Sequence, residues 1–302
     1  MRRRTSWLHG RQPLVTREQR FTSRERTLTP ELNELREEYL ALLDTDAKEQ
    51  VYQKYLEENT RFIPREFVQN HGVSCHIALR KLPFGADYKS DFFFLSKSTT
   101  HWNAVHIEIE KPSSKFFKGN TTDFDPGFQH AVDQIDEWRA WFERGNEEAF
   151  RNIINPLLMP TNMARNPIKH KYVLVYGRRS EYADNDVRRT KVSMRARDDF
   201  KIMSFDSLAE GLAGKSVFNI GVRRNEYIDV IGDKIIDPLI CGLIEPTRFR
   251  ISETAHESLT AIIDGPGIRS QRFTEGKTVN SYQYAADRIL VRRDKELVED
   301  EA

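Results

Sequence analysis

The chain has 302 residues, of which 38% are hydrophobic and 31% are charged, so it can bury the core of one large domain or of two ordinary ones. Its 47 basic and 46 acidic residues nearly cancel, and a net charge of +1 gives no global signal for nucleic acid. Two cysteines exclude a disulfide framework and a four-cysteine zinc site, and no segment approaches the ~20 apolar residues of a membrane span. We therefore expect a polar protein of the reducing cytoplasm, outside any membrane.

The first 26 residues contain eight arginines against two glutamates and have almost no apolar periodicity. This composition fits a phosphate-binding arm, and it fits a solvated terminus equally well. No apolar stretch follows the arginines, so we expect neither a secretory nor a twin-arginine signal. We assign residues 1–28 to an Arg-rich N-terminal arm.

Helical periodicity begins at Thr29 and Pro30, which suit an N-cap and a first helical position, and continues to about residue 59. A polar break near residues 44–46 divides this stretch, so we expect two helices or one interrupted helix. Strands are then predicted at residues 73–79, 91–95 and 105–110, with turn or polar segments between them.

Asp125 and Pro126 begin a predicted helix, whose apolar stripe continues to Phe142 and which Gly145 ends. The elements that follow are a Pro- and Asn-rich linker at 152–167, a central strand at 171–177, a basic helix or loop at 178–200, a strand at 201–205 and a helix at 206–212. This order favours an α/β fold with a mixed sheet flanked by helices.

We place this domain at residues 29–214, and residues 215–302 form a C-terminal extension whose role the sequence does not indicate. Within the extension, strands are predicted at 228–231, 239–244 and 289–291, and a helix at 253–263.

Two carboxylates two residues apart are the feature that points most directly to chemistry. Glu108 and Glu110 share one face of a predicted strand, and Asp91 opens the strand before it. Such a grouping of negative charge is costly unless a cation or water lies beside it, and Mg²⁺ prefers one or two carboxylates with several waters. Asp91 and Glu108, with a backbone carbonyl near Ile109, would suit that ion. The alternative is a solvated edge strand, because Glu-x-Glu arises by chance in a chain with 46 acidic residues.

Gln134 lies on the flank of the apolar stripe of its helix, roughly 100° from the centre of the stripe, and can reach a site beside the sheet. Gln129 is the alternative on the same helix. His106 shares a face with both glutamates, and it either touches the site or serves as a hydrogen-bonded structural histidine.

Two other motifs are incomplete. His106-Ile107-Glu108 matches half of a zinc-deaminase signature, but the two distant cysteines cannot supply the rest. Residues 211–216 are similar to a phosphate-binding loop, but Ala209 stands where the first glycine is required and the segment follows a helix.

Taken in order, these segments resemble the PD-(D/E)XK restriction-endonuclease-like core and, more closely, the Shedu antiphage defence nuclease family. The resemblance covers about residues 50–212. The segments that carry it are Tyr55-Leu56-Glu57-Glu58-Asn59, Gly85-Ala86-Asp87-Tyr88-Lys89-Ser90-Asp91, Glu108-Ile109-Glu110-Lys111-Pro112, Gln129-His130-Ala131-Val132-Asp133-Gln134 and Val175-Tyr176-Gly177-Arg178.

The resemblance implies an endonuclease of prokaryotic antiviral defence that hydrolyses DNA with Mg²⁺, or with Mn²⁺ in its place, as a homo-oligomer (dimer or tetramer). It implies that Asp91, Glu108 and Glu110 are metal ligands and that, with Gln134, they form the catalytic set. Glu110 departs from the family pattern, which more often has lysine there. The alternative is therefore a DNA-end-binding or sensor protein that does not cleave, and a pure interaction scaffold is a third reading.

Five basic residues are candidates for DNA binding: Lys111, Arg178, Arg179, Arg188 and Arg189. On an ideal strand, Lys111 points away from the face of Glu110. The arginines either grip phosphates or form a solvated face paired with nearby aspartates.

Overall fold

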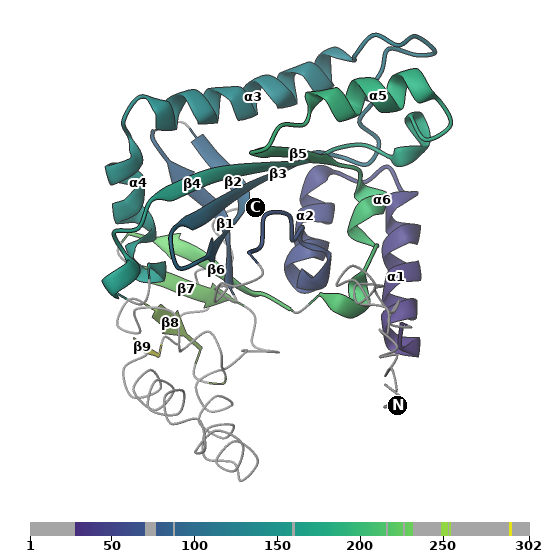
Figure 1. Cartoon of the computed structure of the whole chain (residues 1–302). Helices are drawn as coiled ribbons and strands as arrows, with labels where there is room; N and C mark the ends of the chain where they lie inside the picture. The colour runs from purple at the N-terminus through teal and green to yellow at the C-terminus, as the bar shows by residue number, and fades with distance from the viewer. Residues whose placement is uncertain are drawn as a thin grey trace, which may run out of the picture.

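A mixed β-sheet covered by helices on both faces forms the framework (Figure 1). The computed structural model describes residues 28–69, 77–86, 88–158, 161–215, 217–225, 227–231, 249–252, 254 and 290–291. In these residues nine strands form one sheet, in the order β5-β4-β3-β2-β1-β6-β7-β8-β9. The predicted α/β class with a mixed sheet is confirmed. None of the helices described is both long and apolar enough to cross a membrane.

The centre of the sheet is an antiparallel meander continued by two parallel strands. β1 pairs with β2 and β2 with β3 in antiparallel orientation, while β4 runs parallel to β3 and β5 parallel to β4. Gly85, at a φ of 69°, turns the chain between the first two strands. The bounds are β1 (Ile77–Phe84), β2 (Tyr88–Lys97), β3 (Trp102–Ile109), β4 (Ile168–Val175) and β5 (Phe200–Met203).

One face of the sheet is covered by α1 (Pro30–Leu43) and α2 (Glu49–Glu58), so the N-terminal stretch forms two helices. Thr29 caps the first helix, because its Oγ1 accepts a hydrogen bond from Leu32 N at 3.4 Å. Both helices contribute to a buried cluster that includes Tyr39, Tyr52, Leu56, Phe62, Phe92, Phe94 and Ile107.

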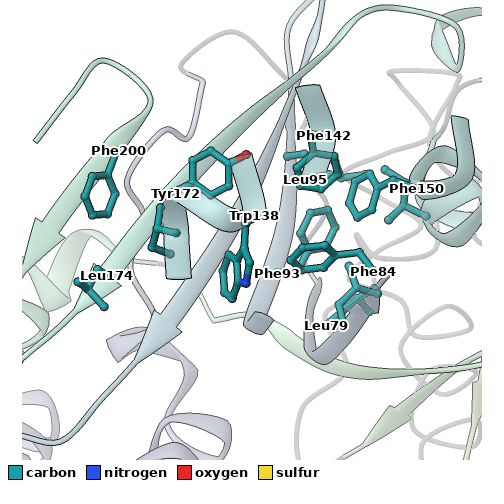
Figure 2. Packing of buried hydrophobic residues seen from close by; sticks show 14 of the residues in the cluster. Leu79, Phe84, Phe93, Leu95, Trp138, Phe142, Phe150, Tyr172, Leu174 and Phe200 are labelled. Atoms are coloured by element: carbon teal, nitrogen blue, oxygen red, sulfur yellow. The ribbon is translucent and has the colours of Figure 1, made fainter. Parts of the chain in front are cut away.

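The other face is covered by α3 (Pro126–Glu143), whose predicted apolar stripe is buried along its length. Asp125 caps this helix, because its Oδ1 accepts from Gly127 N at 2.8 Å. Figure 2 shows Trp138 and Phe142 of α3 packed with Phe84 and Phe93 of the sheet.

α4 (Glu147–Ile154) was not predicted, and the predicted linker begins inside it. This helix has only eight residues, which is too short for its periodicity to stand out, yet it buries Phe150 and Ile154. The predicted linker also contains 3₁₀ turns at Asn155–Leu157 and Thr161–Met163.

Downstream of β4 the basic segment forms α5 (Asp186–Arg195), capped by Asn185, whose Oδ1 accepts from Arg188 N. α6 (Phe205–Leu208) is shorter than the helix predicted at 206–212. Gly211, at a φ of 63°, is left-handed and leads into a separate 3₁₀ turn, so the helix cannot continue through it.

Strands beyond residue 215 join the same sheet. β6 (Asn219–Arg224) runs parallel to β1, and β7 (Tyr227–Ile231) pairs with it in antiparallel orientation. β6 and β8 (Phe249–Ile251) were not predicted, whereas β7 and β9 (Leu290–Val291) lie where strands were expected. Residues 1–27 of the predicted arm, the strand at 239–244 and nearly all of the helix at 253–263 lie outside the described residues.

His106 is a buried core residue, in agreement with the structural alternative for it. Its Nε2 lies 3.1 Å from His170 Nδ1, and the His170 ring stacks on Phe142 with centroids 3.5 Å apart. Burial lowers the pKa of His106 well below its ordinary value and lowers the pKa of His170 to about 3. Both imidazoles are therefore neutral in the folded protein at physiological pH.

We expect this histidine pair to weaken the fold in acid. The folded pKa values lie below the unfolded value of about 6.5, so the unfolded chain binds protons first and the free energy of unfolding falls as the pH drops from about 7 to 5. His170→Gln should reduce that fall by about 1 to 2 kcal/mol. Urea unfolding of both proteins at pH 7.5 and pH 5 measures it, and an identical pH dependence would contradict the assignment.

Candidate active site

Strands β2 and β3 separate at Asp91, and the carboxylate of Asp91 fills the gap. The last pair of their ladder joins Phe92 to Ile107, after which Asp91 Oδ2 accepts a hydrogen bond from the backbone N–H of Ile109 at 2.8 Å. Asp91 is only 6% exposed. A side-chain carboxylate thus takes the place of a ladder carbonyl, which fixes Asp91 against the end of β3.

Glu108 faces α3, where Gln134 Nε2 donates to Glu108 Oε1 at 2.7 Å. Burial and the nearby charge of Asp91 raise the pKa of the Glu108 carboxyl well above its usual range. Its second oxygen, Oε2, is buried without a hydrogen-bond partner among the residues described. An ionised carboxylate with one unsatisfied buried oxygen is a place where a cation would be strongly favoured.

Lys81 enters this site from β1. The β1–β2 ladder joins Arg80 to Phe92 and Leu82 to Ser90, which leaves Lys81 opposite Asp91, and its Nζ donates to Asp91 Oδ1. Burial alone would lower the pKa of Lys81, but the neighbouring carboxylates, Asp91 above all, raise it. Its φ of 47° is rare for a non-glycine residue, and backbone strain of this kind costs on the order of 1 kcal/mol.

α2 supplies the opposite wall. Gln53 Nε2 donates to Asp91 Oδ1 at 3.0 Å and to Glu49 Oε1 at 2.6 Å, so one amide joins two carboxylates. Burial, followed by the charge of Asp91, raises the pKa of Glu49. The site is therefore enclosed by helices from both faces of the sheet.

Glu110 lies one residue beyond the end of β3, although the predicted strand included it. Its backbone N–H bonds to Val175 O at 3.0 Å, which keeps it beside β4. Burial, Glu49 and Asp91 raise the pKa of the Glu110 carboxyl, while the charges of His130 and Lys111 lower it. The Lys111 ammonium is thus near enough for its charge to act on the Glu110 carboxyl.

The donor set fits a divalent ion held by two carboxylates. Among the described residues no group of three His, Cys, Asp or Glu side chains is arranged to hold a metal. Mg²⁺ often uses only one or two carboxylates and keeps several waters. Asp91 and Glu108, with the unpartnered Oε2 of Glu108, match that requirement.

The four arginines that are candidates for DNA binding all make contacts within the chain, which hold the segments after β4 and β5. Their part in DNA binding stays a prediction. The contacts are with the Asp206 carboxylate for Arg178, the Glu210 carboxylate for Arg179, the carbonyl oxygens of Gly119 and Thr121 for Arg188, and the Ala183 carbonyl oxygen for Arg189.

Lys81, Gln53 and Glu49 were not predicted as site residues. A signal for Lys81 was present in the turn at Gly85, because a tight hairpin about that turn places Lys81 opposite Asp91. No comparable signal exists for Gln53 and Glu49, which reach the site only through the packing of α2 on the sheet.

The model of the Shedu protein SduA C-terminal family matches residues 46–209, which is just over half of the chain. This chain belongs to the Shedu family. The matched region contains Lys81, Asp91, Glu108, Glu110 and Gln134, and membership suggests a role in defence against phage. A search of curated proteins gave no match to this Shedu protein.

Glu108→Gln should stabilise the metal-free Shedu protein. The pKa of Glu108 is raised in the folded state, so its ionised form costs stability at pH 8, and the isosteric amide removes that cost. We expect the Tm at pH 8 in a chelator to rise by about 2 to 4 °C, and the gain to be smaller at pH 5, because lowering the pH protonates more of the wild-type Glu108 carboxyl. Thermal unfolding at the two pH values measures this.

Asp91→Asn is the matched comparison. It also removes a charge, but it breaks the ion pair between Lys81 and Asp91, so we expect a lower Tm at pH 8. A fall in Tm for Glu108→Gln similar to that for Asp91→Asn would contradict the electrostatic assignment.

Proposed function

We propose that this Shedu protein is a metal-dependent DNA endonuclease of antiphage defence that hydrolyses phosphodiester bonds. The observation that carries the proposal is the pair of buried carboxylates, Asp91 and Glu108, where β2 and β3 stop pairing, with Glu108 Oε2 left without a hydrogen-bond partner among the described residues. Family membership supports the defence role. Invader DNA, a homo-oligomeric assembly and action in the cytoplasm are part of the same proposal.

Asp91 and Glu108 would hold Mg²⁺, or Mn²⁺ in its place. Such an ion polarises the phosphate and lowers the pKa of a bound water. The protein contributes a fixed geometry: the Ile109 N–H holds Asp91 Oδ2, and Gln134 holds Glu108 Oε1. Both oxygens are thereby oriented before a substrate arrives.

The family pattern more often has a lysine where this chain has Glu110. Here Lys81 and Glu110 together take the catalytic role of that lysine. The Lys81 ammonium lies among three carboxylates and can offer its positive charge to the scissile phosphate. The raised pKa of Glu110 makes it a stronger base, suited to accept a proton from the attacking water.

One observation favours a second candidate function. Lys81 donates to Asp91 Oδ1, an atom that a metal would also use. If that ion pair persists with DNA bound, the protein is a non-cleaving DNA-end-binding or sensor protein with a nuclease fold.

Removing either carboxylate should abolish cleavage. With purified full-length protein and Mg²⁺ or Mn²⁺, Asp91→Ala and Glu108→Ala should each cut linear or supercoiled DNA at least about 100-fold more slowly than wild type. Glu148→Ala, an exposed glutamate on α4, is the control and should cut normally. DNA binding without cutting by the wild type, together with cleavage gained in Glu110→Lys, would favour the second candidate.

Lys81→Met tests whether Lys81 has a catalytic role or only a structural one. We expect a loss of cleavage of about 100-fold or more, while metal binding by calorimetry is kept or tightened because a competing charge beside Asp91 is gone. Lys81→Arg should restore part of the rate, and Lys54→Met, an exposed lysine on α2, should change neither property. Unchanged cleavage in Lys81→Met would remove Lys81 from the mechanism.

A further inference from the structure

A cavity of about 410 Å³ lies between the start of β2 and α3. It adjoins the candidate active site through two of its lining residues. Gln134 is bonded to Glu108, and His130 is close enough for its charge to lower the pKa of Glu110. The other lining residues include Tyr88, Lys89, Glu137 and Trp138.

We propose that this cavity takes one unpaired nucleotide of the DNA substrate, next to the phosphate that is cut. The inference rests on the proposed function, because it takes the carboxylates beside Gln134 as the cutting site. It adds the substrate class, which is DNA with a base that is free to leave the helical stack.

The apolar wall of the cavity is aromatic and is supported from behind. The Tyr88 ring packs on Phe84 with centroids 6.0 Å apart and planes at 24°, and Trp138 meets Phe84 edge-on at 5.3 Å. Figure 2 shows Trp138 and Phe84 within the core. Tyr88 is half-buried, so its ring is held in place while it borders the cavity. Aromatic walls of this kind stack unpaired bases with little sequence preference.

The turn that carries this wall is fixed in place. A Cβ atom at Gly85 would lie 2.9 Å from Trp141 Nε1 of α3, so only glycine allows the turn and the helix to approach so closely. The wall is therefore formed before DNA arrives, which lowers the cost of binding.

The polar groups suit the rest of a nucleotide. His130, Gln134 and Glu137 share one face of α3 at spacings of four and three, and they offer hydrogen-bonding groups to a base edge. Lys89 is exposed at the cavity and supplies a charge for a phosphate. This combination of an aromatic wall, polar side chains and a cation favours a nucleotide over a purely apolar ligand.

The size of the cavity determines the state of the DNA. A volume of about 410 Å³ lies in the range of small-ligand pockets and cannot admit a base pair still stacked in a duplex. A base must be unpaired, or be extruded at a cost of a few kcal/mol, before it enters. Bulges, flaps and single strands avoid this cost and should be preferred over matched duplex.

Cleavage by the full-length protein with Mg²⁺ tests the proposal on three DNAs: a matched duplex, the same duplex with one unpaired adenosine, and that DNA with an abasic site at the unpaired position. Of the three, the wild-type protein should cut the duplex with the unpaired adenosine fastest. Tyr88→Ala should lose that preference by about 5- to 150-fold, the effect of one stacked base, while Tyr88→Phe keeps it. Lys89→Ala should slow cleavage of the unpaired-adenosine DNA and of the abasic DNA equally. Lys169→Ala, at the far end of the sheet, should slow cleavage of none of the three DNAs.

A second readout does not depend on cutting. 2-Aminopurine at the unpaired position should be quenched by wild-type protein in Ca²⁺, and Tyr88→Ala should remove the quenching. Equal cleavage of the base-containing and abasic DNAs by wild type, or quenching unchanged in Tyr88→Ala, overturns the cavity proposal alone. Absence of cleavage by wild type on all three DNAs, with quenching intact, overturns the proposed nuclease activity and retains the nucleotide site.

Discussion

The hydrogen bond from Ile109 N to Asp91 Oδ2 is the contact on which the candidate site depends. It forms because β2 and β3 stop pairing beyond Phe92 and Ile107, which leaves a backbone donor that must be satisfied in a buried place. Asp91 satisfies it, and in doing so it brings a charge into the sheet that attracts Lys81 from β1 and Gln53 from α2. This single break in the strand pairing therefore brings Ile109 of β3, Lys81 of β1 and Gln53 of α2 together around Asp91.

The aromatic layer beneath α3 and the strand ends that carry the carboxylates differ in charge. On the face of α3 the His106 and His170 rings are neutral and packed among aromatic side chains, which gives a rigid layer without charge. At the end of the same strands the carboxylates of Asp91 and Glu108 are held close together against their own repulsion. A carboxylate pair of this kind costs stability, as is common where a site is prepared for a ligand.

The sequence was sufficient for those features that follow from periodicity within one element. The capped helix predicted α3 and the flank position of Gln134, from which it reaches Glu108. Features that depend on relations between elements were not predictable in this way. Lys81 required the register of a hairpin, Gln53 required the docking of a helix, and β6 is interrupted by Gly221 so that its apolar pattern is weak.

The contact between Lys81 and Asp91 also has a consequence for the resting protein. An internal ammonium already neutralises the carboxylate that a metal would bind, so the fold does not need an ion to relieve the repulsion at Asp91. On the proposed metal-dependent function, binding of a divalent cation would exchange one positive charge for another, and loss of the cation would return the protein to an intact ground state. Such a protein would release and rebind its metal without unfolding, unlike small domains whose structure is held together by the metal itself.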